Sequence, residues 1–474
     1  METQIESLEG ESPRRPRLRW LKRAGYALLI LAVPVGLMYF WIGRKESDKL
    51  QEMLTDLDRR EPGGRLEQIE AAREFVPDDE NGARIVMAAV GLLSSNWPPN
   101  EFQTRFQNLP PEVQLAPADF AVLRAEMFRV QPAVEAARKL ADMPRGRHRL
   151  EYARNPIATL LPDQSKCRAA FLVLSYDCLL LNQIEDGDGA LRSCRAMLNA
   201  ARSLGDEPIF ISQLFRTSGV FMACQSIERT LAQGEPLPED MASLQKLLED
   251  EDAFPGLLLA WRGERAALHQ VIECVKRGEV SLDDLAGSRS SWMERTARSV
   301  WSMDARRDHA LFLSLMARRI DEVQRPMHEQ AELEKAFERD IRELPKNAFL
   351  TRNLIPGIAK MGESDRRKHA VVRCAIAALA VERYRQDKKA WPNDLAQLCP
   401  AYLAAVPVDP FDGKPLRYRR VADGVVLYSL GADGVDNGGA LNAGFNTAPG
   451  KDIGIRLWDA AQRRQPPPEN RKAK

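Results

Sequence analysis

The sequence predicts a mainly α-helical protein with a single N-terminal transmembrane helix, an all-α helical domain and a small C-terminal α+β module. Three observations lead to this fold class. An uncharged run of twenty residues occurs near the N-terminus, apolar residues recur with the helical period from about residue 48 to about residue 360, and two strand-like runs occur near the C-terminus. The chain of 474 residues, 44% hydrophobic and 28% charged, otherwise has a globular composition.

Charge and cysteine content exclude several classes of function. The 68 Lys and Arg residues balance 67 Asp and Glu residues, and a net charge of +1 excludes a general polyanion binder, so we expect no nucleic-acid partner. Seven scattered cysteines without a C-x-x-C pair form neither a disulfide framework nor a zinc site. No Walker loop, G-x-G-x-x-G or G-x-S-x-G motif is present, so we expect no small-molecule cofactor and no enzyme activity of those classes.

The uncharged run covers residues 24–43 and predicts a membrane anchor. Twenty helical residues span roughly 30 Å, which matches one bilayer crossing. The alternatives are a cleaved signal peptide and a buried core helix. The run is too long for a signal peptide, and the bulky residues 39–42 stand where a peptidase needs small ones. We therefore expect an uncleaved, single-pass anchor.

Flanking charge sets the expected orientation. Six basic residues precede the run, whereas the three that follow it are mixed with acids. By the positive-inside rule, residues 1–23 form a cytoplasmic basic N-terminus and the bulk of the chain lies on the outer side of the membrane. The preceding basic residues are Arg14, Arg15, Arg17, Arg19, Lys22 and Arg23.

Residues 44–368 form the predicted extracytoplasmic helical domain. One apolar stripe runs from Ala190 to Leu204, and similar patterns cover 165–182, 256–277 and 305–322. Proline and glycine separate these stretches, and strand signals are scarce, which predicts about ten helices with short connections. The motif at 137–144 recurs 64 residues later, but no fixed period follows, so helix ends with similar stop signals are favoured over repeat units.

The helical domain contains no catalytic motif. His269 and Glu273 stand one helical turn apart, where they would orient an imidazole, ligate a metal or form a surface pair, and we favour the surface pair. Arg262, Glu264 and Arg265 are interpreted as a structural ion-pair cluster. The alternative is a hydrolase in which Glu264 and His269 meet in a cleft, because catalytic groups assemble in space rather than along the chain.

The pattern changes near residue 369. A helix is predicted over 371–385 and a short helix over 394–398. Strand-like runs at 416–420 and 425–429 flank Asp423-Gly424, which is a hairpin signal.

An ordered set of residues in this region resembles the C-terminal half of the major pseudopilins of type II secretion. The resemblance covers about residues 370–458 and implies a helix packed on a small antiparallel sheet. The last members of the set are Gly431 and Asp433-Gly434. The members that precede them are, in chain order, Ala380-Val381-Glu382-Arg383-Tyr384, Asp387, Trp391-Pro392, Leu395, Leu398, Tyr402-Leu403, Val406-Pro407, Asp409-Pro410-Phe411, Gly413-Lys414-Pro415-Leu416, Tyr418 and Tyr428-Ser429.

The resemblance also implies a structural calcium ion in the loop after the second strand. Asp433 is the first carboxylate ligand, the carbonyls of Leu430 and Val435 are its partners, and Asp452 is the second carboxylate. Asp436 is a further candidate that the residues themselves supply. Calcium prefers six to eight hard oxygen ligands, which a loop rich in Asp and Gly offers. The alternative is an ordinary Asx turn without an ion.

The chain also departs from the pseudopilins. The anchor lacks their processing site and the Glu inside their hydrophobic helix, and it lies over three hundred residues from the module, so a filament subunit is not expected. The whole layout resembles a class of large uncharacterised membrane-anchored bacterial proteins, a resemblance that brings no function with it. Residues 369–458 are the predicted module, and the Pro-rich residues 459–474 are expected to be a disordered tail. A Cys374–Cys399 disulfide is possible outside the cytoplasm.

Together these features predict a non-enzymatic protein of the bacterial inner membrane, with its N-terminus in the cytoplasm and its bulk in the periplasm. It would act as a scaffold or adaptor for protein partners in the cell envelope, with a link to type II secretion. A peptide-binding helical solenoid is the other alternative, besides the hydrolase.

Overall fold

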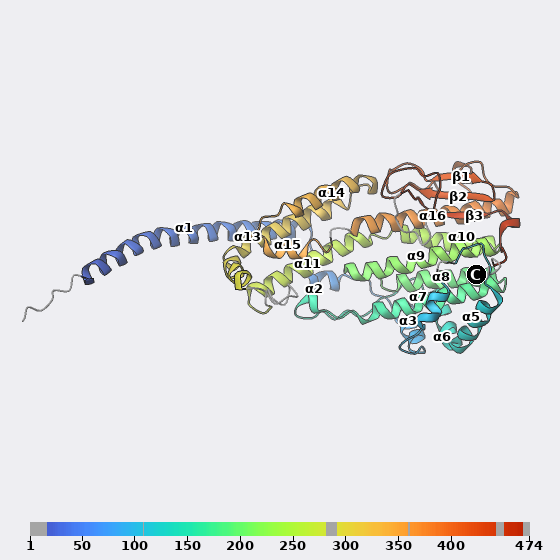
Figure 1. Ribbon diagram of the computed structural model, residues 1–474, viewed down its shortest axis with the longest axis horizontal. Helices are drawn as coiled ribbons and strands as arrows, with labels where there is room; N and C mark the ends of the chain where they lie inside the picture. The colour runs from blue at the N-terminus through green and yellow to red at the C-terminus, as the bar shows by residue number, and fades with distance from the viewer. Residues whose placement is uncertain (1–16, 108, 281–291, 359–360, 442–449, 468–474) are drawn as a thin grey trace, which may run out of the picture.

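The computed structural model describes residues 17–107, 109–280, 292–358, 361–441 and 450–467 (Figure 1). Within them the chain is mostly helical and carries one small antiparallel sheet near its C-terminus, which confirms the coarse fold class. A long helix, α1 (Arg17–Arg60), projects from one end of an elongated body, and the sheet lies toward the other end (Figure 1).

The helices follow the predicted apolar stripes closely. The pattern at 165–182 corresponds to α7, the stripe at 190–204 to α8, and the patterns at 256–277 and 305–322 to α11 and α13. The described α-helices after α1 are α2 (Leu66–Ala71), α3 (Gly82–Val90), α4 (Asn100–Arg105), α5 (Pro117–Arg129), α6 (Gln131–Arg138), α7 (Pro162–Gln183), α8 (Gly187–Arg202), α9 (Phe210–Gln233), α10 (Pro238–Asp252), α11 (Gly256–Lys276), α13 (Trp292–Glu322), α14 (Met327–Arg342), α15 (Phe349–Leu354) and α16 (Met361–Lys388).

Local chemistry explains where several helices begin. The Asp186 carboxylate accepts a hydrogen bond from the Gly189 amide at 2.9 Å, which caps α8, and Asn81 caps α3 in the same way through the Ala83 amide. Pro162, Pro117 and Pro238 stand at the first positions of α7, α5 and α10, where a missing N–H costs nothing.

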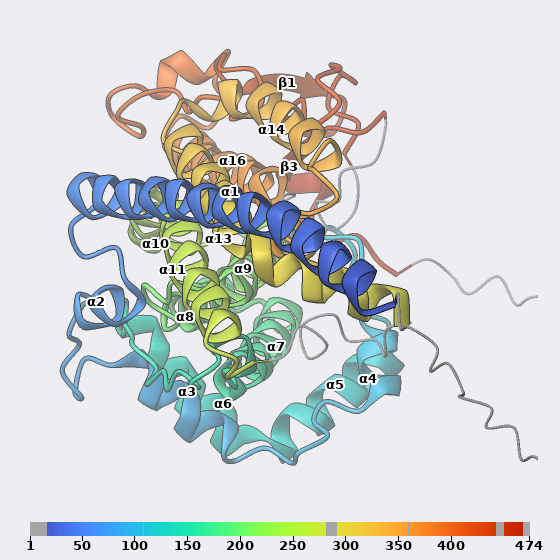
Figure 2. The same ribbon diagram turned by 90° about the vertical axis from the view of Figure 1, so that its left-hand side faces the viewer.

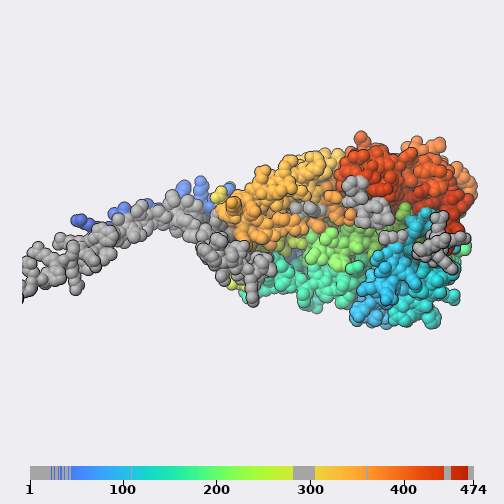
Figure 3. Space-filling model, in the orientation of Figure 1, coloured from blue at the N-terminus to red at the C-terminus, as the bar shows by residue number. Residues whose placement is uncertain are grey.

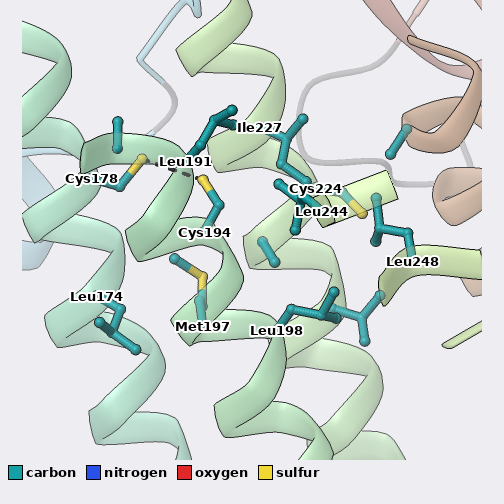
Figure 4. Packing of buried hydrophobic residues seen from close by; sticks show 14 of the residues in the cluster. Leu174, Cys178, Leu191, Cys194, Met197, Leu198, Cys224, Ile227, Leu244 and Leu248 are labelled. Atoms are coloured by element: carbon teal, nitrogen blue, oxygen red, sulfur yellow. Dashed lines mark hydrogen bonds between the residues drawn. The ribbon is translucent and has the colours of Figure 1, made fainter. Parts of the chain in front are cut away.

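One large hydrophobic core joins α7, α8, α9, α10 and α16 to the sheet. Leu174, Cys194, Ile227 and Leu248 come from four of these helices and pack together (Figure 4). Helices α7, α8 and α9 all contact one another.

A second core lies at the end from which α1 projects. It combines the C-terminal part of α1, from Leu50 onward, with α11, α13 and α15, and α1 crosses in front of α11 and α13 in the end-on view (Figure 2). Trp261 of α11 packs there against Phe210 and Phe337. The last three turns of α1 are thus part of the body, whereas its N-terminal part is not.

The sheet has the order β1-β2-β3, with β1 (Arg417–Val421), β2 (Gly424–Ser429) and β3 (Ile453–Trp458) all antiparallel. The hairpin predicted at Asp423-Gly424 is confirmed, because Val421 pairs with Gly424. Gly424 is required there, since a Cβ would lie 2.0 Å from the Leu457 carbonyl oxygen. The expected short helix is the 3₁₀ turn η3 (Leu395–Leu398).

Two boundaries differ from the prediction. The expected domain border at 368/369 falls inside α16, and this helix packs on α9 and α10 as well as on the sheet, so the module shares its core with the helical body. The expected disordered tail is wrong for residues 459–467. Arg463 is buried, η5 (Ala460–Gln462) is helical, and Gln465 exchanges backbone hydrogen bonds with Glu112 and Gln114. Residues 468–474 lie outside the described residues.

Most side chains of the predicted anchor, residues 24–43, also lie outside the described set. Within the part of the chain that the structure describes, no helix is both long and apolar enough for a membrane crossing. The anchor therefore stays a prediction.

Candidate functional site

The three predicted calcium carboxylates hold backbone amides of the loop after β2. Asp433 accepts from the amides of Val435 at 3.1 Å and Gly450 at 3.2 Å. Asp436 accepts from Gly438 at 2.8 Å and also from the Tyr428 hydroxyl at 3.1 Å. Each of these carboxylates keeps free lone pairs, so the contacts do not prevent ion binding.

Asp452 is the most buried of the three carboxylates, with 1% of its surface exposed. Its two oxygens accept from the amides of Asn437 at 3.3 Å and Gly439 at 2.8 Å. Burial, followed by the nearby charge of Asp436, raises the pKa of Asp452. Asp436 and Asp452 thus both hold amides of residues 437–439, in the loop between β2 and β3.

The two residues predicted to supply carbonyl ligands are both held by hydrogen bonds of the module. The Val435 carbonyl accepts from the Asn437 side chain at 3.0 Å, and the Leu430 amide donates to Asp409 at 3.0 Å. Among the described residues, no cluster of three or more His, Cys, Asp or Glu side chains is arranged for a metal ion. The donor types suit calcium, and the binding of an ion stays a prediction.

Asp409 is the main buried carboxylate of this module. Its oxygens accept from the Ser429 hydroxyl at 2.8 Å, from the amides of Phe411 and Leu430 at 2.9 and 3.0 Å, and from Arg417 at 2.6 Å. This one side chain joins the 409–415 loop to β1 and β2. The pseudopilin resemblance contains Asp409 but assigns it no role.

The helical body contains a cavity of about 600 Å³ between the end of α1, α2, α11 and α13. One wall is apolar and includes Leu50, Leu54 and Leu57 of α1. The opposite wall comes from α11 and includes Arg265 and His269. A volume of this size is typical of sites for small ligands.

His269 does not form the isolated surface pair that the sequence favours. Its Nδ1 lies 2.8 Å from Nε2 of His309 on α13, and His309 is fully buried. On the other side of His309, Nδ1 lies 3.4 Å from Glu273 Oε1. The three groups form a chain in the order Glu273, His309, His269 that ends at the cavity.

Two tautomers satisfy the hydrogen bond between the two imidazoles. His309 Nδ1 has no hydrogen-bond partner among the described residues, so the Glu273 contact does not decide between them. Either His309 Nε2–H donates to His269 Nδ1 and the proton of His269 is on Nε2, or His269 Nδ1–H donates and a lone pair is on Nε2. Burial lowers the pKa of His269, and it lowers the pKa of His309 to about 2, so both rings are neutral near pH 7. His269 Nε2 therefore donates or accepts a proton at the cavity according to the tautomer.

Glu264 does not join His269. It accepts a hydrogen bond from the Phe210 amide at 3.1 Å, and burial raises its pKa. The predicted ion-pair cluster within α11 is also rearranged, because Arg265 pairs at 2.6 Å with Glu61, which follows α1, and Arg262 lies 3.8 Å from the same carboxylate. Glu61 and Arg265 are about two hundred residues apart in the sequence, so the sequence alone does not predict this ion pair.

Asp163, His148 and Cys167 form a second cluster, which is arranged like a catalytic triad but whose thiol is closed to solvent. His148 Nδ1 lies 3.3 Å from Asp163, and its Nε2 lies 3.6 Å from the Cys167 thiol. Burial raises the pKa of Cys167 to about 12, so the thiol stays protonated. Cys167 and His148 are at most 4% exposed, which leaves a substrate no route to the sulfur.

The seven cysteines, all in the described residues, are free thiols, including Cys374 and Cys399. The shortest Sγ–Sγ contact that the structure records joins Cys178 of α7 to Cys194 of α8 at 3.6 Å (Figure 4). Comparisons of the chain with protein-family models, with curated proteins and with solved structures find no match.

Proposed function

We propose that this chain is a membrane-anchored adaptor of the bacterial inner membrane that presents a rigid periplasmic body to protein partners in the cell envelope. The observation that carries the proposal is the projecting part of α1. Its described large apolar side chains are each at least 50% exposed: Tyr26, Ile30, Val33, Leu37 and Trp41.

Large apolar side chains on a helix that stands away from the body need a partner that shields them from water. The helix projects from the body in Figure 1, and its described residues, in blue, lie beyond the end of the body in Figure 3. The uncharged run of twenty residues that contains these side chains has the length of a bilayer core, and this favours lipid as the partner. The basic N-terminal flank supports a cytoplasmic N-terminus and a periplasmic body.

The body has the properties of a rigid adaptor. The sheet and α16 share a core with α7–α10, so the pseudopilin-like module is fixed relative to the helices. The buried edge of the sheet is protected, because the Arg456 amide donates to Glu228 at 2.9 Å and the Trp458 carbonyl accepts from Arg463 at 3.0 Å. A calcium ion held by Asp433, Asp436 and Asp452 would stabilise the loop beside this sheet, and the resemblance favours partners of the type II secretion machine.

Membrane fractionation tests the anchor. Val33→Arg combined with Leu37→Arg places two charges in mid-span, each costing about 2.5–3.5 kcal/mol on insertion scales, and should move the chain to the soluble fraction. Glu52→Arg with Thr55→Arg, on exposed positions of the same helix beyond the run, should leave it in the membrane. In-cell crosslinking of the wild type then tests the adaptor role, and recovery of crosslinks only between copies of this chain would contradict it.

One observation favours a hydrolase as the second candidate function. His269 is a neutral imidazole that is hydrogen-bonded to His309 and lines a cavity, where its Nε2 serves as a base when the proton is on Nδ1. Chromogenic esters and phosphoesters would serve as substrates. Turnover that His269→Gln abolishes and that the exposed-residue control His328→Gln retains would support the enzyme, and absence of turnover across the set would count against it.

A further inference from the structure

The cavity between α1 and α11 combines an apolar wall with basic groups. Its leucines come from α1, α2 and α13: Leu50, Leu54, Leu57, Leu66 and Leu313. Its basic residues come from the loop after α1, from α11 and its end, and from α13: Arg65, Arg265, Lys276, Arg277 and Arg306. Such a lining fits a ligand with an anionic head and an apolar part.

Arg265 is the best-placed group for the anionic head. Its side chain is only 6% exposed, and its Nη2 pairs with Glu61 at 2.6 Å. Its Nη1 is buried without a hydrogen-bond partner. An unsatisfied buried guanidinium N–H is costly, and an oxyanion in the cavity would relieve that cost.

The acidic residues of the lining are largely neutralised by neighbours. Asp58 pairs with Arg65 at 2.9 Å, Glu61 with Arg265, and Glu273 with Lys276 at 2.7 Å. Arg277 pairs at 2.9 Å with Glu279, which is not part of the lining. Three of the four carboxylates of the lining are thus paired with a basic group, and five basic residues stand against the four.

His269 stands one turn after Arg265 on α11, so both side chains lie on the same helix face toward the cavity. The His309 contact occupies its Nδ1, and in the tautomer in which His309 Nε2–H donates to that nitrogen, His269 carries its proton on Nε2 and donates it to a ligand. A phosphate group accepts several hydrogen bonds at once and suits an arginine and an imidazole placed together.

We propose that this cavity binds a phosphate-bearing ligand, with the phosphate held by Arg265 and His269 and the apolar part on the leucines of α1. Ser47, the first residue of the lining, follows the end of the uncharged run by four residues, or about 6 Å of helix. If α1 is the anchor proposed above, the cavity opens close to the membrane surface. The phosphate then comes from a phospholipid headgroup or from a soluble phosphoester.

Titration calorimetry on the purified full chain tests the site with three probes: inorganic phosphate, glycerophosphate and a short-chain phosphatidylglycerol below its micelle concentration. All three should bind at one site. Arg265→Gln should weaken each by about tenfold or more, because a hydrogen bond to a charged group is lost. Tighter binding of the lipid than of glycerophosphate identifies the lipid source, and equal binding identifies a soluble phosphoester.

Arg262→Gln is the matched control, because Arg262 lies on the same helix beside Glu61 but does not line the cavity. It should retain wild-type binding. Should Arg265→Gln fail to fold, His269→Gln provides the second variant and should weaken binding while leaving the melting temperature in the absence of ligand near that of the wild type. Failure of all three probes to bind, or unchanged binding in a folded Arg265→Gln chain, would overturn the proposal. Neither result depends on membrane fractionation, so this site and the anchor fail separately.

Discussion

His269 and His309 hydrogen-bond to each other at 2.8 Å, and Glu273 lies 3.4 Å beyond His309. The outer imidazole therefore reaches the cavity while the inner one is enclosed by protein. This difference in exposure has consequences for how the fold responds to acid.

The buried His309 should make the fold sensitive to mild acid. Burial lowers its pKa to about 2, whereas an unfolded histidine titrates near 6.5. Below pH 6.5 the unfolded chain thus binds a proton on this histidine that the folded chain does not bind. The stability of the folded state that is present above pH 6.5 is therefore lost as the pH falls. Between pH 7 and pH 5 this one group accounts for about 2 kcal/mol. Urea unfolding should show a smaller loss over that range for His309→Gln than for the wild type.

The exposed His328 supplies the comparison for this measurement, since 43% of its side chain is exposed. His328→Gln should keep the full pH dependence of the wild type. An equal dependence in His309→Gln and wild type would mean that the ring is accessible to water.

Asp409 should be the carboxylate on which the C-terminal module depends most. It is fully buried with four donors, including Arg417, and Asp409→Ala leaves that guanidinium without its buried partner. Breaking a buried pair costs about 3–5 kcal/mol. Asp412→Ala removes a more exposed partner of the same Arg417 and should cost about 1 kcal/mol. Denaturant midpoints of the full chain distinguish the two, and equal losses would contradict the role assigned to Asp409.

Calcium should stabilise the loop after β2. An ion present at a hundred times its dissociation constant adds about 2.7 kcal/mol to the free energy of unfolding. We expect a higher melting temperature of the full chain with Ca²⁺ than with chelator, and Asp433→Ala should remove the difference. Because the module shares its core with the helices, this test requires the full chain rather than a fragment. A chelator-insensitive wild type would leave the loop as an Asx turn.

Thiol reactivity should follow burial. Cys399 is partly exposed, and the other six cysteines are buried. A water-soluble thiol reagent should therefore modify one cysteine in the native chain and all seven after denaturation. Cys399→Ser should abolish the native reaction. Rapid native modification of a second cysteine, such as Cys178 or Cys194, would contradict the packing of α7 on α8.

The parts of the fold with strong local signals were predictable from the sequence. The stripe from Ala190 to Leu204 forms α8, and Asp423-Gly424 forms the hairpin, because a 3.6-residue period and a turn pair are local properties. Strand β3 is not among the predicted strands although Ile453, Ile455 and Leu457 alternate, because the resemblance assigns the preceding Asp452 to a calcium loop.

The cavity site was predictable only in part. His269 and Glu273 are four residues apart, so their proximity is visible in the sequence. His309 lies forty residues further on, and Glu61 precedes Arg265 by about two hundred, so only tertiary packing brings these groups together. Glu264 is a candidate partner of His269 in the sequence because it is a carboxylate a few residues away. Its position on α11 directs it to the Phe210 amide instead.

The C-terminal segment offers a test of an expectation that packing overturns. Glu382 is fully buried in α16, and Arg463 donates to both of its oxygens, at 3.0 and 2.9 Å, and to the Gly234 carbonyl at 2.6 Å. Deletion of residues 459–474 removes this guanidinium and leaves Glu382 with Arg385 as its remaining ion-pair partner within the described residues. Since the loss of one partner from a buried pair is strongly destabilising, we expect a cost of about 3 kcal/mol in urea unfolding.

Deletion of residues 468–474 alone is the matched control, because it keeps Arg463 and every contact described for residues 459–467. It should leave the unfolding midpoint unchanged, and Arg463→Ala in the full chain should reproduce most of the loss caused by the longer deletion. If the longer deletion proves as stable as the wild type, residues 459–474 contribute nothing to the free energy of unfolding, as expected of the disordered tail that their composition predicts. If Arg463→Ala matches the longer deletion, a single buried ion pair accounts for the order of the segment, because the polar and Pro-rich sequence around it offers little apolar surface to bury.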